Sequence, residues 1–356
     1  MGNMMQRRLR ACPAALRDGA LVLAVLFSCF AGLLLGDTHL SAGEAAGALL
    51  QGSFAGGPAA PSDISDGSDI IWNLRLPRML LSLSAGMGLA LSGVVMQALF
   101  RNPMSSPYIM GISSGASLGV VLAAFLGAGM SAWGTAAMGF GAFAGSFLLS
   151  LAILAAAGRR SGDPSYLLIL GVAMSAVCSG VTGVLIYCGA ASSGTDVSMY
   201  WLMGSVASAR LIPSLLLLLV VVAFGGFFLT QARILNLMLL GREAALPLGW
   251  DLQPFFKGYL VLNAILVGLI VMEAGLIGFV GLIVPHFVRL LLGPDHKRVV
   301  PAAIILGGLL TVWADILGRV LLHGVEIPMG VMLAVIGAPL FLFLLAETTG
   351  KKGGSR

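Results

Sequence analysis

The chain has 356 residues, of which 58% are hydrophobic and only 10% are charged, and its mean hydropathy is +0.99. A soluble globular protein carries about 25% charged residues, so this composition excludes an ordinary soluble domain. The formal net charge of +5 does not indicate nucleic-acid binding, because the basic residues lie in short loops between apolar segments and form no single patch.

Ten apolar runs follow one another along the chain, and most are close to the roughly 20 residues that a helix needs to cross a bilayer. The first run follows a cluster of arginines, as in a signal peptide, but more runs come after it and no small-residue cleavage site stands out, so we expect an uncleaved helix. The runs do not alternate between apolar and polar residues, which predicts helices, since only helices and closed barrels satisfy their backbone groups in lipid. The predicted spans cover residues 14–35, 79–99, 109–127, 131–157, 166–188, 211–229, 255–272, 275–292, 299–322 and 328–346.

These runs predict an all-α integral membrane protein with about ten transmembrane helices in a single transmembrane domain over residues 1–356. The positive-inside rule sets the orientation. With a cytoplasmic N-terminus, every Lys and Arg lies in an inner segment except Arg75, Arg78, Arg210 and Arg319. An even number of spans then places both termini in the cytoplasm.

Two connections between the predicted spans are long. Residues 36–78 form an extracytoplasmic loop, and its stretch Gly52–Ser68, rich in Gly, Pro, Ser and Asp, is expected to be flexible. Residues 230–254 lie on the cytoplasmic side. This inner segment is too polar to span the membrane, but it carries Leu and Ala at helical spacing, which predicts short helices.

Pairs of glycines four residues apart predict close contacts between helices. Gly115 and Gly119 form one such pair, and Gly141 and Gly145 form another. Small residues at this spacing give a helix a flat face on which a second helix can pack with its backbone near.

A weak internal repeat also relates two parts of the chain that run in the same direction. It predicts a parallel repeat of the second to fifth and the seventh to tenth helices, although so few matches in a Gly-rich chain can also arise by chance. An offset of 188 residues superposes Gly93 on Gly281, Arg101 on Arg289 and Gly119 on Gly307.

The sequence lacks the common motifs of enzymes. It has no GxxxxGK[ST] motif, so it does not bind a nucleotide phosphate by that route. The stretch GISSG at residues 111–115 formally matches the GxSxG pattern of serine nucleophiles, but no base is evident for it. We therefore expect no catalytic residue and no metal site, since the histidines are scattered at His39, His286, His296 and His323.

Charged residues inside the spans are scarce. Only Asp315 and Arg319 are clearly placed at membrane depth, and their spacing of four residues puts them on one face of a helix, where they can neutralise each other. A proton-coupled secondary transporter usually carries more acidic or histidine residues along its spans. The scarcity favours a protein whose energy comes from outside this chain, and a secondary transporter remains the alternative.

Several segments, taken together, resemble the iron-siderophore, haem and cobalamin permeases of ABC importers. The resemblance extends in order over almost the whole of residues 75–345, so it is specific for the family and much less specific for the substrate. The segments are 75–119, which begins RLPRMLLSLSAGMGLALSG, then WLMGSV (201–206), LGREAALPLGW (240–250), GFVGLIVPHFVRLLLGPDHK (278–297) and ADILGRVLLHGVEIPMGVMLAVIGAPLFLFLL (314–345).

This resemblance implies a multi-pass permease of the bacterial inner membrane, with ten helices per copy and a translocation path at the axis of a homodimer or other permease pair. It also implies two cytoplasmic ATPase subunits, which hold the ATP and Mg²⁺, and a periplasmic or lipid-anchored protein that delivers the substrate. No cofactor is expected on this chain. Iron chelates are the commonest substrates of the family, so a ferric siderophore is the first expectation, with haem and cobalamin left open.

Three groups of residues are singled out for roles in transport. The first lies in the inner segment and is expected to dock into the ATPase, the alternative being an ordinary amphipathic connector. Small residues there allow close approach, and charged ones can pair across an interface. The coupling residues are Gly241, Arg242, Glu243, Ala244, Leu248 and Gly249.

The second group is expected to line a chemically bland path for a bulky substrate, because a transport route must release its cargo. For any one of these residues, tight helix packing is an equally good interpretation. The path residues are Gly93, Gln97, Asn102, Gly111, Ser113, Ser114, Gly115, Ser117, Gly171 and Ser175.

The third group consists of Arg75, Arg78 and Arg319, which violate the positive-inside bias at the outer ends of their helices. Members of the resembling family meet acidic groups of their binding proteins with arginines at these motif positions, so a docking role is expected. The alternative is structural, with the arginines reaching lipid headgroups or pairing locally, Arg319 with Asp315.

Overall fold

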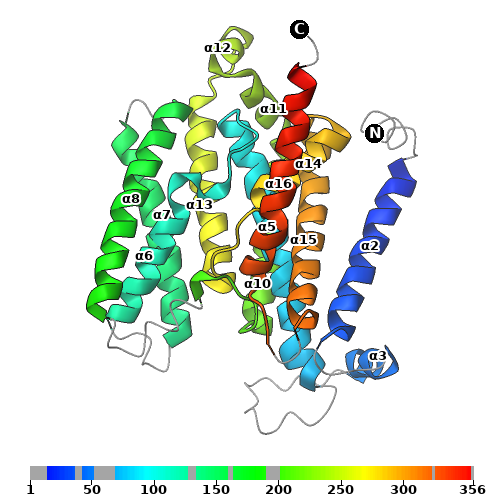
Figure 1. Ribbon diagram of the computed structural model, residues 1–356. Coiled ribbons are helices and arrows are strands. Elements are labelled where there is room, and N and C mark those ends of the chain that lie inside the picture. The colour runs from blue at the N-terminus through cyan, green and yellow to red at the C-terminus, as the bar shows by residue number, and fades with distance from the viewer. Residues whose placement is uncertain are drawn as a thin grey trace.

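The computed structural model describes residues 14–36, 42–51, 69–126, 134–158, 163–189, 201–322 and 325–353. All the regular structure of these residues is helical, which confirms the predicted all-α class. Figure 1 shows the helices side by side in one bundle.

Each of the ten predicted spans coincides with a helix. Among the residues that the structure describes, six segments are long and apolar enough to cross a membrane by length and composition, whereas the apolar parts of α2, α6, α14 and α16 are shorter. Ten membrane crossings therefore remain a prediction. The helices are α2 (Ala14–Leu34), α5 (Leu76–Leu99), α6 (Ile112–Phe125), α7 (Gly134–Ala157), α8 (Pro164–Gly189), α10 (Leu211–Thr230), α13 (Gln253–Ala274), α14 (Val280–Leu292), α15 (His296–Val320) and α16 (Met329–Gly353).

Helix α5 lies at the centre of the bundle and packs against α10, α13, α14 and α15. Glycines make the closest of these contacts possible. A Cβ added at Gly86 would overlap the carbonyl group of Gly307 on α15, and one added at Gly93 would overlap that of Gly281 on α14. The α5 backbone thus runs directly against two neighbouring helices, as small residues in membrane helices allow.

The predicted glycine faces of α6 and α7 are confirmed. Gly115 lies against Gly145, and Gly119 lies against Gly141, so that a Cβ at any of the four would collide with backbone of the other helix. The two helices consequently pack along most of their length. Residue size and spacing predict the two faces, whereas the pairing of one face with the other is seen only in the structure.

The two ends of the bundle differ in the short helices they carry. At one end lie the start of α2, the last turns of α16, and the connection that contains α11 (Ala232–Leu240) and α12 (Arg242–Ala245). At the other end lie α3 (Ala42–Gln51) and η1 (Ile70–Arg75), a wider turn that continues into α5 (Figure 1). We call these the α12 end and the α3 end.

The connection predicted as the loop 36–78 contains more structure than expected. Helix α3 packs its alanines on Ile71 and Leu33, and the indole Nε1 of Trp72 donates to the carbonyl oxygen of Ala48 at 2.9 Å. The stretch Gly52–Ser68, expected to be flexible, lies outside the described residues. A reading based on membrane spans misses α3 because its ten residues are too few to cross a bilayer, although its alanines favour a helix.

The offset of 188 residues does not superpose helix on helix, so this part of the repeat argument is wrong. Residues 76–99 form one continuous helix, whereas the corresponding residues contain the end of α13 and the start of α14. Between those helices Phe279 has φ 66°, and Val280 N donates to Gly278 O at 2.8 Å, which closes a rare, strained γ-turn. The parallel repeat itself remains a prediction.

Candidate functional site

The segment between α10 and α13 is an exposed, largely apolar surface at the α12 end. It consists of α11, a turn at Gly241, α12, η5 (Leu246–Leu248) and a second turn at Gly249. The predicted short helices are confirmed. We call residues 240–250 the coupling segment.

Burial within the coupling segment divides it into an anchor and a presented face. Ala245 is fully buried, and its carbonyl oxygen accepts from Trp250 N at 3.1 Å, which closes the segment on itself. Arg242, Glu243 and Ala244 are exposed. So are the large apolar side chains Leu240, Leu246, Leu248 and Trp250.

Two glycines form the turns of the coupling segment, and only one of them is exposed to solvent. Gly249 is exposed and has φ 82°, a conformation that favours glycine. Gly241 is buried, and a Cβ added there would lie 2.5 Å from the guanidinium of Arg101. A small pocket of about 50 Å³ lies beside Gly241, lined in part by Arg101, Arg242 and Gln253. The predicted contact residues are therefore gathered in one place, with Gly241 beneath the surface.

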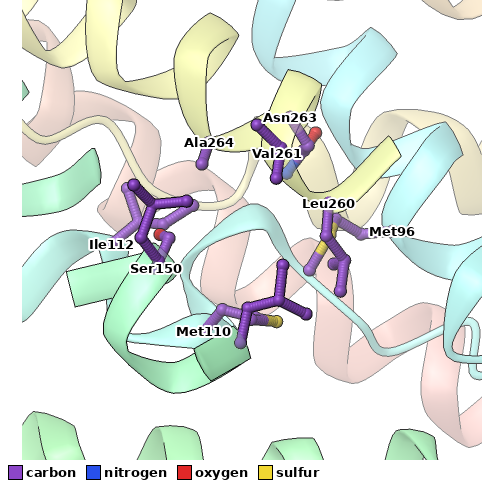
Figure 2. A pocket seen from close by; sticks show the side chains of 10 residues that line it. Met96, Met110, Ile112, Ser150, Leu260, Val261, Asn263 and Ala264 are labelled. Atoms are coloured by element: carbon purple, nitrogen blue, oxygen red, sulfur yellow. The ribbon is translucent and has the colours of Figure 1, made fainter. Parts of the chain in front are cut away.

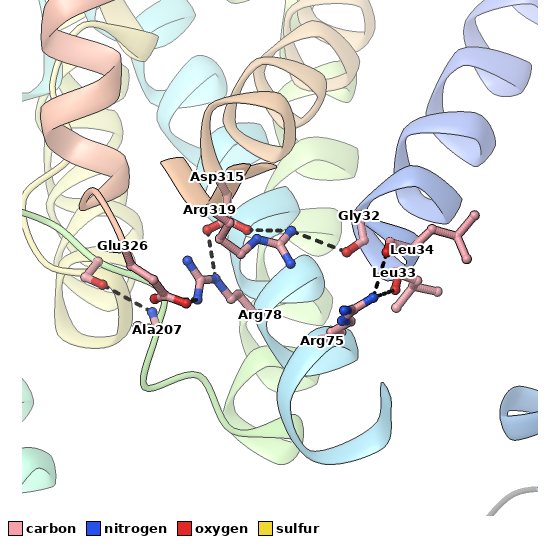
Figure 3. A network of polar contacts seen from close by, with 10 residues as sticks. Gly32, Leu33, Leu34, Arg75, Arg78, Ala207, Asp315, Arg319 and Glu326 are labelled. Atoms are coloured by element: carbon pink, nitrogen blue, oxygen red, sulfur yellow. Dashed lines mark hydrogen bonds and ion pairs between the residues drawn. The ribbon is translucent and has the colours of Figure 1, made fainter. Parts of the chain in front are cut away.

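At the α3 end, two arginines reach the C-terminal carbonyls of α2 (Figure 3). Arg75 is only 5% exposed, and its Nη1 donates to Leu33 O at 2.6 Å and to Leu34 O at 2.8 Å. Arg319 Nη2 donates to Gly32 O at 3.3 Å. Because the last carbonyls of a helix have no partner within it, these bonds cap α2 and attach it to the bundle.

A buried carboxylate, that of Asp315, joins Arg319 to Arg78 of α5. Asp315 Oδ2 lies 3.1 Å from Arg319 Nη2, so the predicted pair is confirmed. Asp315 Oδ1 also accepts from Arg78 Nε at 2.9 Å, and Arg78 Nη1 donates to both oxygens of Glu326 at 3.0 and 2.8 Å. Sequence reasoning missed Arg78 and Glu326 as partners, since 237 residues separate Arg78 from Asp315.

These contacts agree with the structural interpretation of the three arginines, because each guanidinium group donates hydrogen bonds to acceptors within this chain. Arg75 and Arg319 are buried, and the side chain of Arg78 is 12% exposed. Glu326, at 52%, is the most exposed member of the cluster. A docking role for Arg75, Arg78 and Arg319 stays a prediction, and the burial of these side chains speaks against direct contact with a partner.

Several of the predicted path residues have packing roles within the chain. Gly93 and Gly115 allow backbone contacts, and Gly111 has φ 73° at the start of α6, with Ser175 of α8 close by. Ser117 Oγ donates to Ser113 O at 3.0 Å. Ser113 and Ser114 are half-buried.

The remaining path residues also differ in exposure. Gln97 is buried in a hydrogen-bonded cluster, and Gly171 is buried on α8. Asn102 accepts from Met104 N at 2.9 Å in the turn after α5. The lining role of the whole set remains a prediction.

One pocket lies between α5, α6, α7 and α13 (Figure 2). Its cavity volume is only about 10 Å³, and its wall is mostly apolar, with Met96 and Met110 on it and the carboxamide of Asn263 at its edge. None of the predicted path residues lines it. A space that holds about one water molecule cannot take a bulky chelate. Among the residues that the structure describes, no three His, Cys, Asp or Glu side chains are grouped to hold a metal.

Helix α8 offers an outward face that sequence reasoning did not single out. Only 17% of the most apolar part of residues 164–188 is buried in the bundle. The corresponding share is 83% for residues 70–99, which include α5. The exposed positions of α8 include many small residues. Their number along this helix is the sequence signal that could have revealed the face. They are Ala173, Ala176, Ser179, Gly180 and Gly183.

Comparisons with known proteins agree with this architecture. The model of the FecCD transport family matches residues 22–347. The vitamin B12 import system permease protein BtuC of Klebsiella pneumoniae is 38% identical over 288 residues, which cover 80% of this chain and 85% of that protein. The BtuC protein of Citrobacter koseri is 37% identical over 295 residues, covering 81% and 87%.

A solved structure is also similar. It is a metal-chelate type ABC transporter in an inward-facing conformation, with a TM-score of 0.76 and 30% sequence identity. The match covers 92% of this chain and 98% of that one.

Proposed function

The chain belongs to the FecCD transport family and is a permease of the ABC importer class, and from that premise we propose that its cargo is cobalamin or a similar bulky metal chelate. The relatives named as vitamin B12 permeases move the preference from a ferric siderophore to cobalamin. Haem and ferric siderophores are the alternative cargoes that the transport experiment below distinguishes. No observation favours an ion-coupled secondary transporter.

The exposed apolar face of the coupling segment is the observation that supports an ATPase as the energy source of transport. Leu248 is 62% exposed and Leu246 48% at an end of the bundle where the positive-inside rule predicts cytoplasm. Such a cluster, flanked by Arg242 and Glu243, has the composition of a protein interface with an apolar centre and a polar rim. We assign it to a cytoplasmic ATPase subunit that holds ATP and Mg²⁺.

The outward face of α8 supports pairing with a second copy. Its small residues let two helices approach closely, or leave room between them for a path at the axis of the pair. Gly171 and Ser175 also lie on α8, but Gly171 is buried and Ser175 is only half-exposed, so they are not part of this outward face. The proposed assembly has two permeases, two ATPases and a binding protein, in a bacterial inner membrane.

Within the single domain of residues 1–356, we assign the segment 230–254 to the cytoplasmic side and the long connection of residues 36–78 to the extracytoplasmic side. The binding protein would meet the α3 end. Glu326 is the exposed charged group of the arginine cluster there, so it is the first residue that such a partner would contact.

Reconstitution tests the proposal. The permease is co-expressed with the ATPase and binding protein of the same genome and placed in proteoliposomes. Uptake of radiolabelled cyanocobalamin, a ferric hydroxamate and haemin is then compared with and without ATP inside. We expect ATP-dependent uptake of cyanocobalamin that is unchanged when the proton gradient is dissipated. ATP-dependent uptake of another chelate would correct the cargo, and uptake driven by the gradient alone would contradict the ABC mechanism.

A further inference from the structure

Asn236 links the helix before the coupling segment to the start of α15. It lies in the middle of α11, and its Nδ2 donates to Asp295 Oδ1 at 2.9 Å. Its Oδ1 accepts from the backbone N of His296 at 3.0 Å and lies 2.6 Å from His296 Nδ1. Asp295 is itself the N-cap of α15, accepting from Lys297 N at 3.2 Å. One side chain of α11 therefore binds both residues at which α15 begins.

These contacts fix the orientation of the groups involved. A backbone N–H can only donate and a carboxylate can only accept, so the Asn236 amide can point in one direction only. Its Oδ1 then requires a proton on His296 Nδ1, which leaves Nε2 as an acceptor. Nε2 faces Arg289 Nη2 of α14 at 3.4 Å.

The cluster continues from His296 into the centre of the bundle. Arg289 Nη1 donates to Gln97 Oε1 of α5, and Arg289 Nη2 donates to Val94 O at 3.3 Å. Gln97 Nε2 returns to α14 by donating to Leu282 O at 3.1 Å. Directed hydrogen bonds thus join α11, α15, α14 and α5, of which α5 is the central helix.

We infer that Asn236 is a positioning residue that fixes the coupling segment to α15, so that movement of the segment is passed through His296 and Arg289 to α5. The inference rests on the proposed function, in which the ATPase acts on that segment. Apolar contacts such as those of Leu235 and Met238 on α11 are not directional and permit sliding. The hydrogen bonds of Asn236 are directional, and those to the buried His296 hold one register, while the bond to Asp295 lies at the surface.

The test exchanges the two polar groups at the junction. In Asn236→Asp a carboxylate faces the carboxylate of Asp295, so the bond becomes a repulsion. In Asp295→Asn the new amide still accepts from Asn236 Nδ2 and still caps α15. In the double variant N236D/D295N the amide donates to the carboxylate, which restores the bond with its direction reversed.

The readout is the amount of cyanocobalamin taken up per ATP hydrolysed by the complete importer. We expect N236D to lower this ratio at least about tenfold, D295N to change it by less than about twofold, and the double variant to recover most of the loss. Binding of the ATPase to the permease, measured by co-purification, should stay at the wild-type level in all three variants. Arg233→Gln, an exposed change on the same helix, is the control.

Three results would overturn the inference. The first is an unchanged ratio in N236D. The second is a double variant that stays as poor as N236D, since the damage then does not come from the lost bond. The third is a loss in N236D that parallels a fall in melting temperature and in bound ATPase, because the cluster would then only support folding. A wild-type permease that binds no ATPase would instead contradict the proposed function.

Discussion

Asp315 on α15 accepts a hydrogen bond from Arg78 on α5, with 2.9 Å between Oδ1 and Nε. The same carboxylate, only 3% exposed, also neutralises Arg319. One negative charge therefore serves two arginines that are largely removed from water, and it joins the central helix to α15 at the α3 end.

Removing this charge should be costly. We expect Asp315→Asn to destabilise the permease by about 3–5 kcal/mol, because it leaves the buried guanidinium of Arg319 without its counter-ion, while Arg78 keeps Glu326. Glu326→Gln is the matched control. It touches the same Arg78, but Glu326 is half exposed, so its loss should cost no more than about 1 kcal/mol. Denaturation of the purified protein in mixed micelles measures both, and equal losses would contradict the central role of Asp315.

The contact of α6 with α7 makes a second prediction. Gly119→Ala places a methyl group where the backbone of Gly141 lies, so the helices must separate, at a cost of about 1–3 kcal/mol. Gly226→Ala on α10 meets no atom within 4 Å and should be neutral or slightly stabilising, since Ala favours helix over Gly. Melting temperatures in detergent compare the two. A tolerant Gly119 would show that the helices can move apart freely.

The coupling segment predicts separation of hydrolysis from transport. Ala244→Trp adds bulk on an exposed face, so insertion and folding should be unchanged while transport per ATP falls at least about tenfold. Gly249→Trp is a poorer probe, because φ 82° would strain any side chain there. Transport at the wild-type ratio in Ala244→Trp, with the ATPase still bound, would exclude this face from the interface.

The features that the sequence predicts are those determined by local properties. The spans follow from apolar runs, and the small-residue faces that hold Gly119 and Gly141 follow from residue size and spacing, although not which helix packs on which. The pair of Asp315 with Arg319 is also local, since four residues make one helical turn.

Features that depend on the three-dimensional arrangement could not be predicted. Arg78 finds Asp315 only after α5 and α15 have packed, and nothing in the sequence marks either as the partner of the other. The γ-turn at Phe279 is a further case. Its positive φ is unfavourable for an aromatic residue and is tolerated where Gly337 of α16 leaves room for the ring. Local propensity alone argues against such a turn.

Asp295 predicts a dependence of stability on pH. Hydrogen bonds from Asn236 and from Lys297 N hold the pKa of this carboxyl below its usual value. A lowered pKa in the folded state means that the stabilising contribution is present above the unfolded value of about 3.9 and is lost as the pH falls through the folded value. Melting temperatures of wild type and Asp295→Asn should therefore converge as the pH falls below about 4. A constant difference between them would show that the charge of Asp295 is not involved.

Arg75 distinguishes the structural from the docking interpretation of the outer arginines. Arg75→Ala removes a charged donor from the last carbonyls of α2, so we expect the isolated permease to lose about 1.5–3 kcal/mol before any partner is added. If its role is internal, stimulation of ATP hydrolysis by the binding protein should keep the wild-type dependence on salt, because no charge has been removed from the docking surface. The measurements are the melting temperature of the permease alone and stimulated hydrolysis by the folded complex at several salt concentrations. A normal melting temperature together with a flattened salt dependence would assign Arg75 to the partner and not to α2.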